Sequence, residues 1–343
     1  MNVTGTTPGW PTADMPVPGE LLTQLSIAAV ALYTLVTAAS RAIDRLVALA
    51  EYYDVDEVLV GMTILALGTS LPELGSHLIG SLGILSGVLD YRVTSAVVVG
   101  GNTGSSTVQQ LLLVGVLLIS LGKVHLSPAF VRESYLPMLG AISVTLLLAW
   151  DGTISRLDGV LLLGLYLLYV GVRIARRKRM PTLQERPSDN PRRDALVATG
   201  LLALVLVSAS LLLTVVEALV GTLALGGSMV GVVTIGVAAA LPELTTVMDA
   251  VRRQSPNIAL GTLVGSNIVN PLVGIGLGGA LSTYYVPPAV VLWDLPFKLG
   301  IGCVLLGWTV YWRDGELTRT EGAYLLGAYF VFLTGRLLLF PGQ

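Results

Sequence analysis

The stretch GTSLPEL, residues 68–74, lies inside a longer apolar run, GMTILALGTSLPELGSHLIGSLGIL (61–85). The run exceeds the ~20 apolar residues that a helix needs to cross a bilayer. Glu73 is costly in such a segment, because ionisable side chains within a membrane are rare and mostly functional. Pro72, directly before it, lacks a backbone N–H and is expected to bend or break the helix. The stretch therefore predicts an interrupted membrane helix with a carboxylate at the interruption.

A second copy of this pattern occurs in the other half of the chain. GMTILALGTSLPEL (61–74) aligns without gaps on GVVTIGVAAALPEL (231–244), which repeats the glycine and the whole LPEL. Downstream, GGNTGSSTVQQLLLVG (100–115) aligns on GTLVGSNIVNPLVGIG (261–276), with a shared Gly-Ser pair. A chance match between Gly- and Leu-rich helices is the alternative, but paired Pro-Glu dipeptides at equivalent depth are rare. Repeats with interrupted helices are typical of secondary transporters, which bind substrate near the midplane where the repeats meet.

The composition is that of a membrane protein with many spans. Of the 343 residues, 53% are hydrophobic and only 12% are charged, whereas soluble domains are about 25% charged. We predict an all-α polytopic membrane protein with ten transmembrane helices, arranged as two inverted five-helix repeats. The predicted spans are 21–40, 57–83, 93–120, 133–150, 158–175, 195–221, 227–250, 257–281, 287–311 and 321–340.

A basic, proline-rich segment, RRKRMPTLQERPSDNPRRD (176–194), separates the two sets of five spans. It divides the chain into an N-terminal tail (1–20), a first half (21–175) and a second half (195–343), each half with one repeat. Because five is odd, the second half enters the membrane upside down relative to the first. Sixteen of the 20 basic residues fall on the linker's side. The positive-inside rule therefore predicts a cell inner (plasma) membrane protein with a cytoplasmic linker and both termini outside.

The other four basic residues are expected near outer helix ends, and the Arg336 side chain would reach the interface there. With no basic residue in mid-span, Glu73 and Glu243 lack a protein counter-ion, so they must be protonated or bind cations from solution. Two carboxylates match the charge of one divalent or two monovalent cations. The four residues on the outer side are Arg92, Arg156, Lys298 and Arg336.

The residues around each interruption supply oxygen atoms. Pro72 leaves the carbonyl of Gly68 without its helical partner, and Pro242 does the same for Ala238. Backbone freed in this way is tolerated at membrane depth only where it lines a cavity or a ligand site. Side chains three or four residues apart share a helix face with each other and add hard oxygen ligands of the kind Ca²⁺ prefers. They are Thr69 and Ser70 with Glu73, Ser105 with Gln109, and Ser266 with Asn270.

Several of these polar residues have a structural alternative. Ser105 and Ser266 would also permit close helix packing in a membrane. His77 follows Glu73 by one helical turn; it is a candidate proton carrier in the physiological range, or else a hydrogen-bonded structural residue. Three amides would equally serve as hydrogen bonds between helices; these are Asn102, Asn267 and Gln110.

GTSLPEL, the second LPEL and GSNIVN (265–270) resemble the cation/Ca²⁺ exchanger superfamily, most closely its prokaryotic Na⁺/Ca²⁺ exchanger-like members. The resemblance implies that Glu73 and Glu243 are the central Ca²⁺ ligands, assisted by the backbone carbonyls of Thr69 and Ala239. It also implies two long tilted gating helices, one at the start of each half, and alternating access. Flanking Na⁺ sites would be formed by the carbonyls of Ala66 and Gly236, the hydroxyls of Ser70, Ser105 and Ser266, and the amides of Gln109 and Asn270.

The sequence departs from this family pattern in two respects. The second repeat has Ala238-Ala239-Ala240 where the first has Gly68-Thr69-Ser70, so carbonyl ligation survives but two hydroxyls are lost. Gln109 stands where a shorter asparagine is usual, and Asn270 where some relatives have aspartate. A site with fewer hydroxyls favours fewer Na⁺ ions than three per Ca²⁺.

We therefore predict a secondary active antiporter that exports Ca²⁺ in exchange for Na⁺ by alternating access at a central two-glutamate site. The alternatives are exchange for H⁺, carried by the glutamates, and transport of another divalent cation such as Mg²⁺ or Mn²⁺. An intramembrane enzyme would need a His/Asp metal motif or a Ser/Lys nucleophile pair inside the spans, and the sequence shows neither. We expect no enzymatic activity, no cofactor and no nucleic-acid partner, and a monomer that works within the lipid bilayer.

Overall fold

The structure, a computed structural model, describes residues 18–53, 66–175, 189–223, 226–252, 256–340 and 342. Within these ranges, nine helices are long and apolar enough to cross a membrane. They correspond to nine of the ten predicted spans; the remaining one, 57–83, lies partly outside the described residues. The chain is thus an all-helical protein that crosses the membrane several times. The nine helices are Leu21–Leu46, Tyr91–Leu121, Pro128–Leu148, Arg156–Ala175, Pro191–Val220, Gly227–Thr245, Ala259–Ser282, Val290–Trp312 and Arg319–Leu339.

The two halves contain similar successions of elements. In the first half these are α1 (Pro18–Tyr52), α3 (Ala66–Thr69), α4 (Leu71–Ser86), α5 (Tyr91–Thr107), η2 (Val108–Leu113), α6 (Val114–Leu121), β1 (Lys123–His125), α7 (Pro128–Phe130), η3 (Val131–Tyr135), α8 (Leu136–Leu148), β2 (Thr153–Ile154) and α9 (Arg156–Ala175). In the second half these are α10 (Pro191–Leu223), α11 (Gly227–Val230), η4 (Gly231–Gly236), α12 (Val237–Ala239), α13 (Leu241–Arg252), α14 (Pro256–Val269), η5 (Asn270–Ile275), α15 (Gly276–Ser282), β3 (Tyr284–Tyr285), η6 (Val290–Asp294), α16 (Leu295–Trp312), β4 (Glu316–Thr318) and α17 (Arg319–Leu339).

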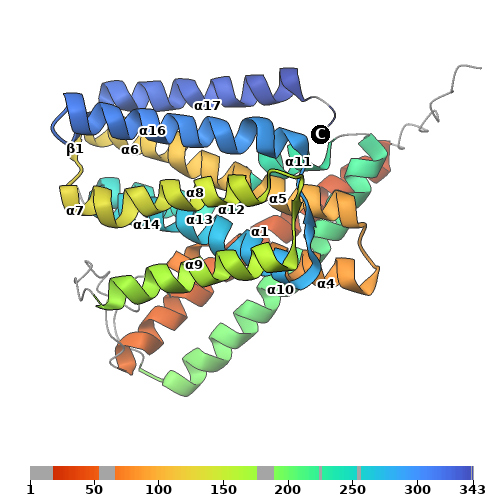
Figure 1. Cartoon of the computed structure of the whole chain (residues 1–343). Coiled ribbons are helices and arrows are strands. Elements are labelled where there is room, and N and C mark those ends of the chain that lie inside the picture. Colours follow the sequence, from red (N-terminus) through yellow and green to blue (C-terminus); the bar gives the residue numbers. More distant parts are fainter. Residues whose placement is uncertain are drawn as a thin grey trace, which may run out of the picture.

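Two long helices, α1 and α10, begin the two halves, with 35 and 33 residues. They pack against each other and run at a clear angle to α8, α9, α16 and α17 (Figure 1). Their contact includes the small residues Ala38 and Ala39 against Val205, and small residues let membrane helices approach closely. The family resemblance predicts two long helices at these positions, and α1 and α10 are long and inclined to these four helices.

Both repeats are interrupted one residue before their LPEL sequence. In the first, α3 ends at Thr69 and α4 starts at Leu71; in the second, α12 ends at Ala239 and α13 starts at Leu241. A proline in the first turn of the new helix needs no N–H donor there, so the chain restarts at little cost. Five further segments, η2 to η6, are π-helical, a form that is rare and frequent at functional sites.

Two small antiparallel sheets depart from the all-α expectation. Strand β1 pairs with β4, setting Val124 opposite Leu317, and β2 pairs with β3, setting Ile154 opposite Tyr284. All four of these residues are buried, while their neighbours in the strands are more exposed. Strands of two or three residues are too short to produce a periodic sequence signal. Each sheet joins the first half of the chain to the second.

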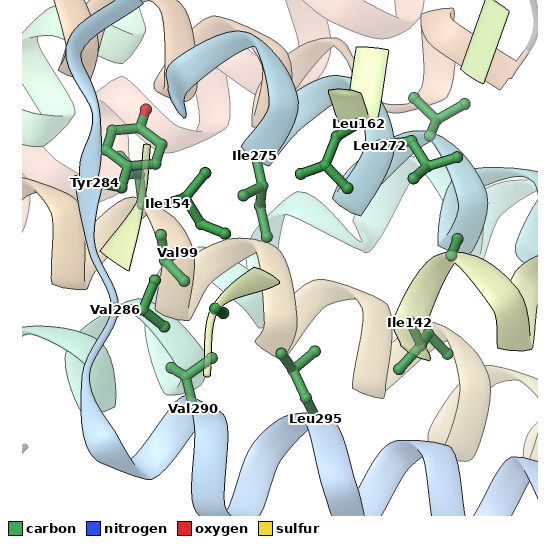
Figure 2. Close-up of a cluster of buried hydrophobic side chains, with 14 of the residues drawn as sticks. Val99, Ile142, Ile154, Leu162, Leu272, Ile275, Tyr284, Val286, Val290 and Leu295 are labelled. Carbon is green, nitrogen blue, oxygen red and sulfur yellow. The ribbon is translucent and has the colours of Figure 1, made fainter. Parts of the chain in front are cut away.

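The core near the second sheet is built from both halves. Figure 2 shows Val99 and Ile142 from the first half together with Ile275 and Leu295 from the second. The ring of Tyr284 lies in the same cluster, beside Ile154 of the neighbouring strand. This apolar cluster therefore packs residues of both halves against each other.

Candidate cation site

Glu73 and Glu243 occupy equivalent positions in the first turns of α4 and α13. Both side chains are buried, with exposed fractions of 2% and 0%. The interruption before each glutamate creates a helix N-terminus inside the bundle, and its partial positive charge favours a nearby carboxylate. Each break therefore places a helix N-terminus, and not a basic side chain, beside a buried glutamate.

Glu73 is contacted from both repeats. The hydroxyl of Ser105, on α5, donates to Glu73 Oε1 at 2.6 Å. The amide nitrogen of Asn270, on η5, makes a longer contact of 3.5 Å with the same oxygen. The second oxygen, Oε2, is buried and has no hydrogen-bond partner.

Glu243 has the corresponding surroundings. Ser266, on α14, donates to Glu243 Oε1 at 3.0 Å, and Thr69 from the first repeat lies 3.1 Å from the Ser266 hydroxyl. Glu243 Oε2 is also buried without a partner. The aligned serines of the two repeats, Ser105 and Ser266, therefore perform the same task for the aligned glutamates.

Helix α14 and its continuation η5 bring the two glutamates together. Ser266 contacts Glu243 and Asn270 contacts Glu73, and residues four apart on a helix have Cβ atoms about 5–6 Å from each other. Glu73 and Glu243 are thus linked by a short path of contacts through Ser266 and Asn270. Among the described residues, no lysine or arginine forms an ion pair with either glutamate.

The unpartnered atoms at this position are oxygens. Besides the second oxygens of the two glutamates, the Ser70 hydroxyl and Asn270 Oδ1 are buried without hydrogen-bond partners. Buried polar atoms normally have partners, so a group of orphaned oxygens requires an explanation. Carboxylate, hydroxyl and amide oxygens are the ligands that Ca²⁺ takes. In the described part of the chain, no group of three or more His, Cys, Asp or Glu forms a conventional metal site.

Gln109 differs from its counterpart Asn270 in its hydrogen bonds. Its Oε1 accepts from Asn267 Nδ2 at 2.9 Å, and its Nε2 donates to the Ser105 hydroxyl at 3.2 Å. The neighbouring Gln110 points elsewhere and donates to the backbone carbonyl of Lys298. The sequence predicts both amides as ligands of flanking Na⁺ sites, and in the structure their hydrogen bonds differ.

His77 belongs to a buried network beside Glu73. Its Nε2 lies 3.0 Å from Asn102 Nδ2, and its Nδ1 lies 3.2 Å from the Tyr284 hydroxyl. Asn102 Nδ2 also donates to the backbone carbonyl of Asn270 at 2.7 Å. A Cβ atom on Gly274 would come within 2.7 Å of that amide nitrogen, so only glycine leaves room for the network here.

The backbone positions of the predicted site lie around the two breaks. Gly236 and Ala239 are buried just before the second break, and a Cβ atom on Gly236 would come within 2.7 Å of the Ser105 amide nitrogen. The absence of a side chain thus lets the two repeats touch. Ala66 is the first residue of α3, and its side chain lies outside the described part.

Two buried ion pairs were missed by the sequence analysis. Arg336, expected to reach the outer interface, is instead fully buried with its Nε 3.2 Å from Asp294 Oδ1, and it also donates to Ser228. In the first half, Arg173 Nη1 lies 2.6 Å from Glu133 Oε2. Each pair joins an acid in a π-helical segment (η3 or η6) to an arginine in the last turn of α9 or α17.

Lys298 is a further correction to the predicted outer residues. It is only 2% exposed, on α16, rather than solvated at a helix end. The sequence signal for the two ion pairs is an acid in the fourth span of each half (Glu133 and Asp294) and an arginine in the fifth (Arg173 and Arg336).

The arrangement of helices and the two-glutamate centre can be compared with known proteins. The family model described as sodium/calcium exchanger protein matches residues 23–175 and 195–338. The chain belongs to the sodium/calcium exchanger family. This exchanger is thus a membrane antiporter by family. Its family is one of transporters rather than of enzymes.

Among its relatives, the exchanger is 28% identical to the inner membrane protein YrbG of Escherichia coli over 329 residues, which cover 91% of this chain and 96% of YrbG. It is also similar to the solved structure of the sodium-calcium exchanger NCX_Mj, with a TM-score of 0.60 and 18% identity, covering 92% of this chain and 99% of that one. The H⁺/Ca²⁺ exchanger CAX gives a TM-score of 0.73 at 15% identity, covering 93% and 82%. At these identities the two solved structures show a shared fold.

Proposed function

We propose that this exchanger is a secondary active antiporter that exports Ca²⁺ in return for Na⁺, at a central site formed by Glu73 and Glu243. The supporting observation is the pair of buried carboxylates, contacted by Ser105 and Ser266 and without a basic partner among the described residues. An uncompensated buried charge costs several kcal/mol after relaxation. The site therefore favours a bound cation, and crossing without one is disfavoured, which enforces exchange.

The proposed ligands follow from the atoms that face this centre. The free oxygens of the two glutamates would neutralise and bind the divalent ion, together with the carbonyls of Thr69 and Ala239 beside the breaks. Ser70 and Asn270, whose oxygens are also without partners, would serve the monovalent ions, as would Ser105 and Ser266 when their hydroxyls turn. The carbonyls of Ala66 and Gly236 would complete these flanking positions, and the bends at Pro72 and Pro242 would hold the whole set open.

We further propose ten membrane helices in two inverted five-helix repeats, in the form of a monomer. The paired breaks, the paired ion pairs and the two sheets, which each join one half to the other, support this repeat. The charge asymmetry supports a cytoplasmic 176–194 linker with both termini outside. The name of YrbG, an inner membrane protein, supports an inner-membrane location.

Exchange of Ca²⁺ for H⁺ is the second candidate. The observation that favours it is the fold similarity to the H⁺/Ca²⁺ exchanger CAX, together with two carboxylates that can each carry one proton. In that case Glu73 and Glu243 would release protons as Ca²⁺ binds.

Flux measurements in proteoliposomes test the proposal. The purified protein is reconstituted, and uptake of radioactive Ca²⁺ is measured with an outward Na⁺ gradient at equal pH, and separately with an outward H⁺ gradient without Na⁺. We expect uptake driven by Na⁺. Uptake that follows only the pH gradient would replace Na⁺ by H⁺ as the coupling ion, and no uptake under either gradient would refute Ca²⁺ exchange.

A further inference from the structure

The amide positions of the two repeats are unequal. Gln109 and Asn270 align with each other, but Asn270 Oδ1 is buried without a hydrogen-bond partner, whereas Gln109 Oε1 accepts from Asn267. The residue aligned with Asn267 in the first repeat is Ser106, whose hydroxyl donates to the backbone of its own helix at Asn102. Asn267 of the second repeat therefore contacts the amide oxygen of Gln109, whereas no described residue of the first repeat donates to Asn270 Oδ1.

The direction of the hydrogen bonds around Gln109 is fixed by a backbone carbonyl. Asn267 Nδ2 donates to the carbonyl of Leu263 at 2.8 Å, and a carbonyl can only accept, so this atom is the nitrogen. Its second N–H then donates to Gln109 Oε1, which leaves Gln109 Nε2 facing the Ser105 hydroxyl as a donor. Ser105 in turn donates a hydrogen bond from its hydroxyl to Glu73 Oε1.

Asn267, Gln109 and Ser105 thus form a chain of hydrogen bonds in which each residue donates to the next, and Ser105 donates to the Glu73 carboxylate. Gln109 therefore presents an N–H group, and not its amide oxygen, to the Ser105 hydroxyl beside Glu73. A cation at this position would have to turn the Gln109 amide and break its bond with Asn267, which would leave a buried donor unpaired, and unpaired buried donors are costly. The amide oxygen of Asn270, by contrast, has no hydrogen-bond partner to lose when a cation binds.

We infer that Asn267 closes the Gln109 side of the site to monovalent cations, so that two rather than three of them exchange for one Ca²⁺ and exchange moves no net charge. This inference rests on the proposed function. Two buried carboxylates are consistent with it, because they balance either one divalent or two monovalent cations. The inference concerns Na⁺, because protons carried by the two carboxylates would need no amide oxygen as a ligand.

Voltage dependence of the wild-type protein gives the first test. Ca²⁺ uptake into proteoliposomes is measured with the membrane potential clamped at several values by K⁺ and valinomycin. We expect the same uptake rate at every potential, and a Hill coefficient of about 2 for the coupling ion, since this coefficient is bounded by the number of sites. Uptake that changes strongly with potential, or a coefficient near 3, would overturn the inference while leaving Ca²⁺ exchange intact. Absence of Ca²⁺ uptake would instead refute the proposed function.

Substitution of Asn267 gives the second test. Asn267→Ala frees Gln109 Oε1, so the half-saturating concentration of the coupling cation should fall about 5-fold, and uptake should become voltage-dependent while Ca²⁺ affinity stays within about 2-fold. Ser106→Ala, the matched control at the aligned position, should change neither quantity. Equal behaviour of the two variants would contradict the role of Asn267. If Asn267→Ala does not fold, Asn267→Ser, which carries the residue of the aligned position, is measured in its place.

Discussion

The two repeats contribute the same centre but different surroundings. Beside Glu73, one turn along α4, His77 joins a polar network with Asn102 and Tyr284. The aligned residues beside Glu243 are Val247 and Leu263, which lie in an apolar cluster together with Val124 of β1. Both clusters are fully buried, and both support a broken helix. The comparison shows that the carboxylate, its serine and the break are repeated, while the packing that holds them is not.

This difference assigns a role to each side. An apolar cluster fixes a helix through shape and volume alone, whereas a hydrogen-bonded network also fixes its orientation and is costly when incomplete. The network holds the backbone carbonyl of Asn270 through Asn102, and so positions the residue that contacts Glu73. The polar network beside Glu73 therefore sets the alignment of η5 with α4. The apolar cluster beside Glu243 only has to stay packed.

The largest effect on Ca²⁺ transport is expected from substitution of the glutamate that both repeats share. Glu73→Gln and Glu243→Gln should each lower Ca²⁺ transport by more than about 100-fold, because loss of a charge partner at a buried site costs ~3–5 kcal/mol. Initial rates of Ca²⁺ uptake in proteoliposomes measure this. The matched control is Ser70→Ala, which should be mild because Ala240 stands at the aligned position of the second repeat. Near-normal transport by either glutamine variant would show that the site lies elsewhere.

An intermediate effect on stability is expected from the two ion pairs. Arg336→Ala should lower the free energy of unfolding by ~3–5 kcal/mol, since it leaves Asp294 buried without a charge partner. Arg173→Ala should cost less, because the side chains of Arg173 and Glu133 are 10% and 6% exposed rather than fully buried. Thermal unfolding in detergent compares the variants. The double change Asp294→Leu with Arg336→Met should recover most of the loss, and a double variant no better than Arg336→Ala would show that the charges themselves are required.

The smallest effect concerns His77. The Asn270 carbonyl fixes the Asn102 amide nitrogen toward the ring, so His77 Nε2 must accept and the proton is assigned to Nδ1. Such a ring is neutral and cannot gain a proton without losing its bond from Asn102. We expect His77→Gln to retain Ca²⁺ transport within about 3-fold and to leave its pH profile unchanged, whereas His77→Val should lower stability by ~1–3 kcal/mol through unpaired groups.

The measurement for His77 is transport against pH, together with thermal unfolding. A pH profile that shifts in His77→Gln would identify His77 as the proton carrier that the sequence allowed. In that case the first repeat would carry a proton-linked histidine, whereas the aligned Val247 of the second repeat has no group that titrates.

Much of the fold could be predicted because the features that decide it are local. A proline before a glutamate in an apolar run signals a broken helix wherever it occurs, and the repeat of LPEL signals a second one. The contacts of Glu73 and Glu243 with Ser105, Ser266 and Asn270 stay a predicted binding site, since only ion binding or transport can test it. The prediction that Arg336 reaches the interface was wrong, because the packing of α17 against η6 buries it beside Asp294.

The remaining features depend on long-range geometry. Gln109 and Asn270 have equivalent places in the alignment, and only the position of Asn267 on a neighbouring helix makes them unequal. The strands are another case, since neither Val124 nor Leu317 has a local pattern that indicates pairing. Sequence patterns thus locate the residues of the centre, and packing decides the direction in which their atoms point.

The two small sheets set an order on how the chain can be assembled during synthesis. Strand β1 is completed early, at residues 123–125, but its partner β4 spans residues 316–318, just before the final helix. Strand β2 likewise has no partner until β3 has been made. For most of translation the edges of both strands are therefore open, and contacts between residues distant along the chain are slow to form. Neither sheet can therefore form until parts of both halves of the chain have been synthesised.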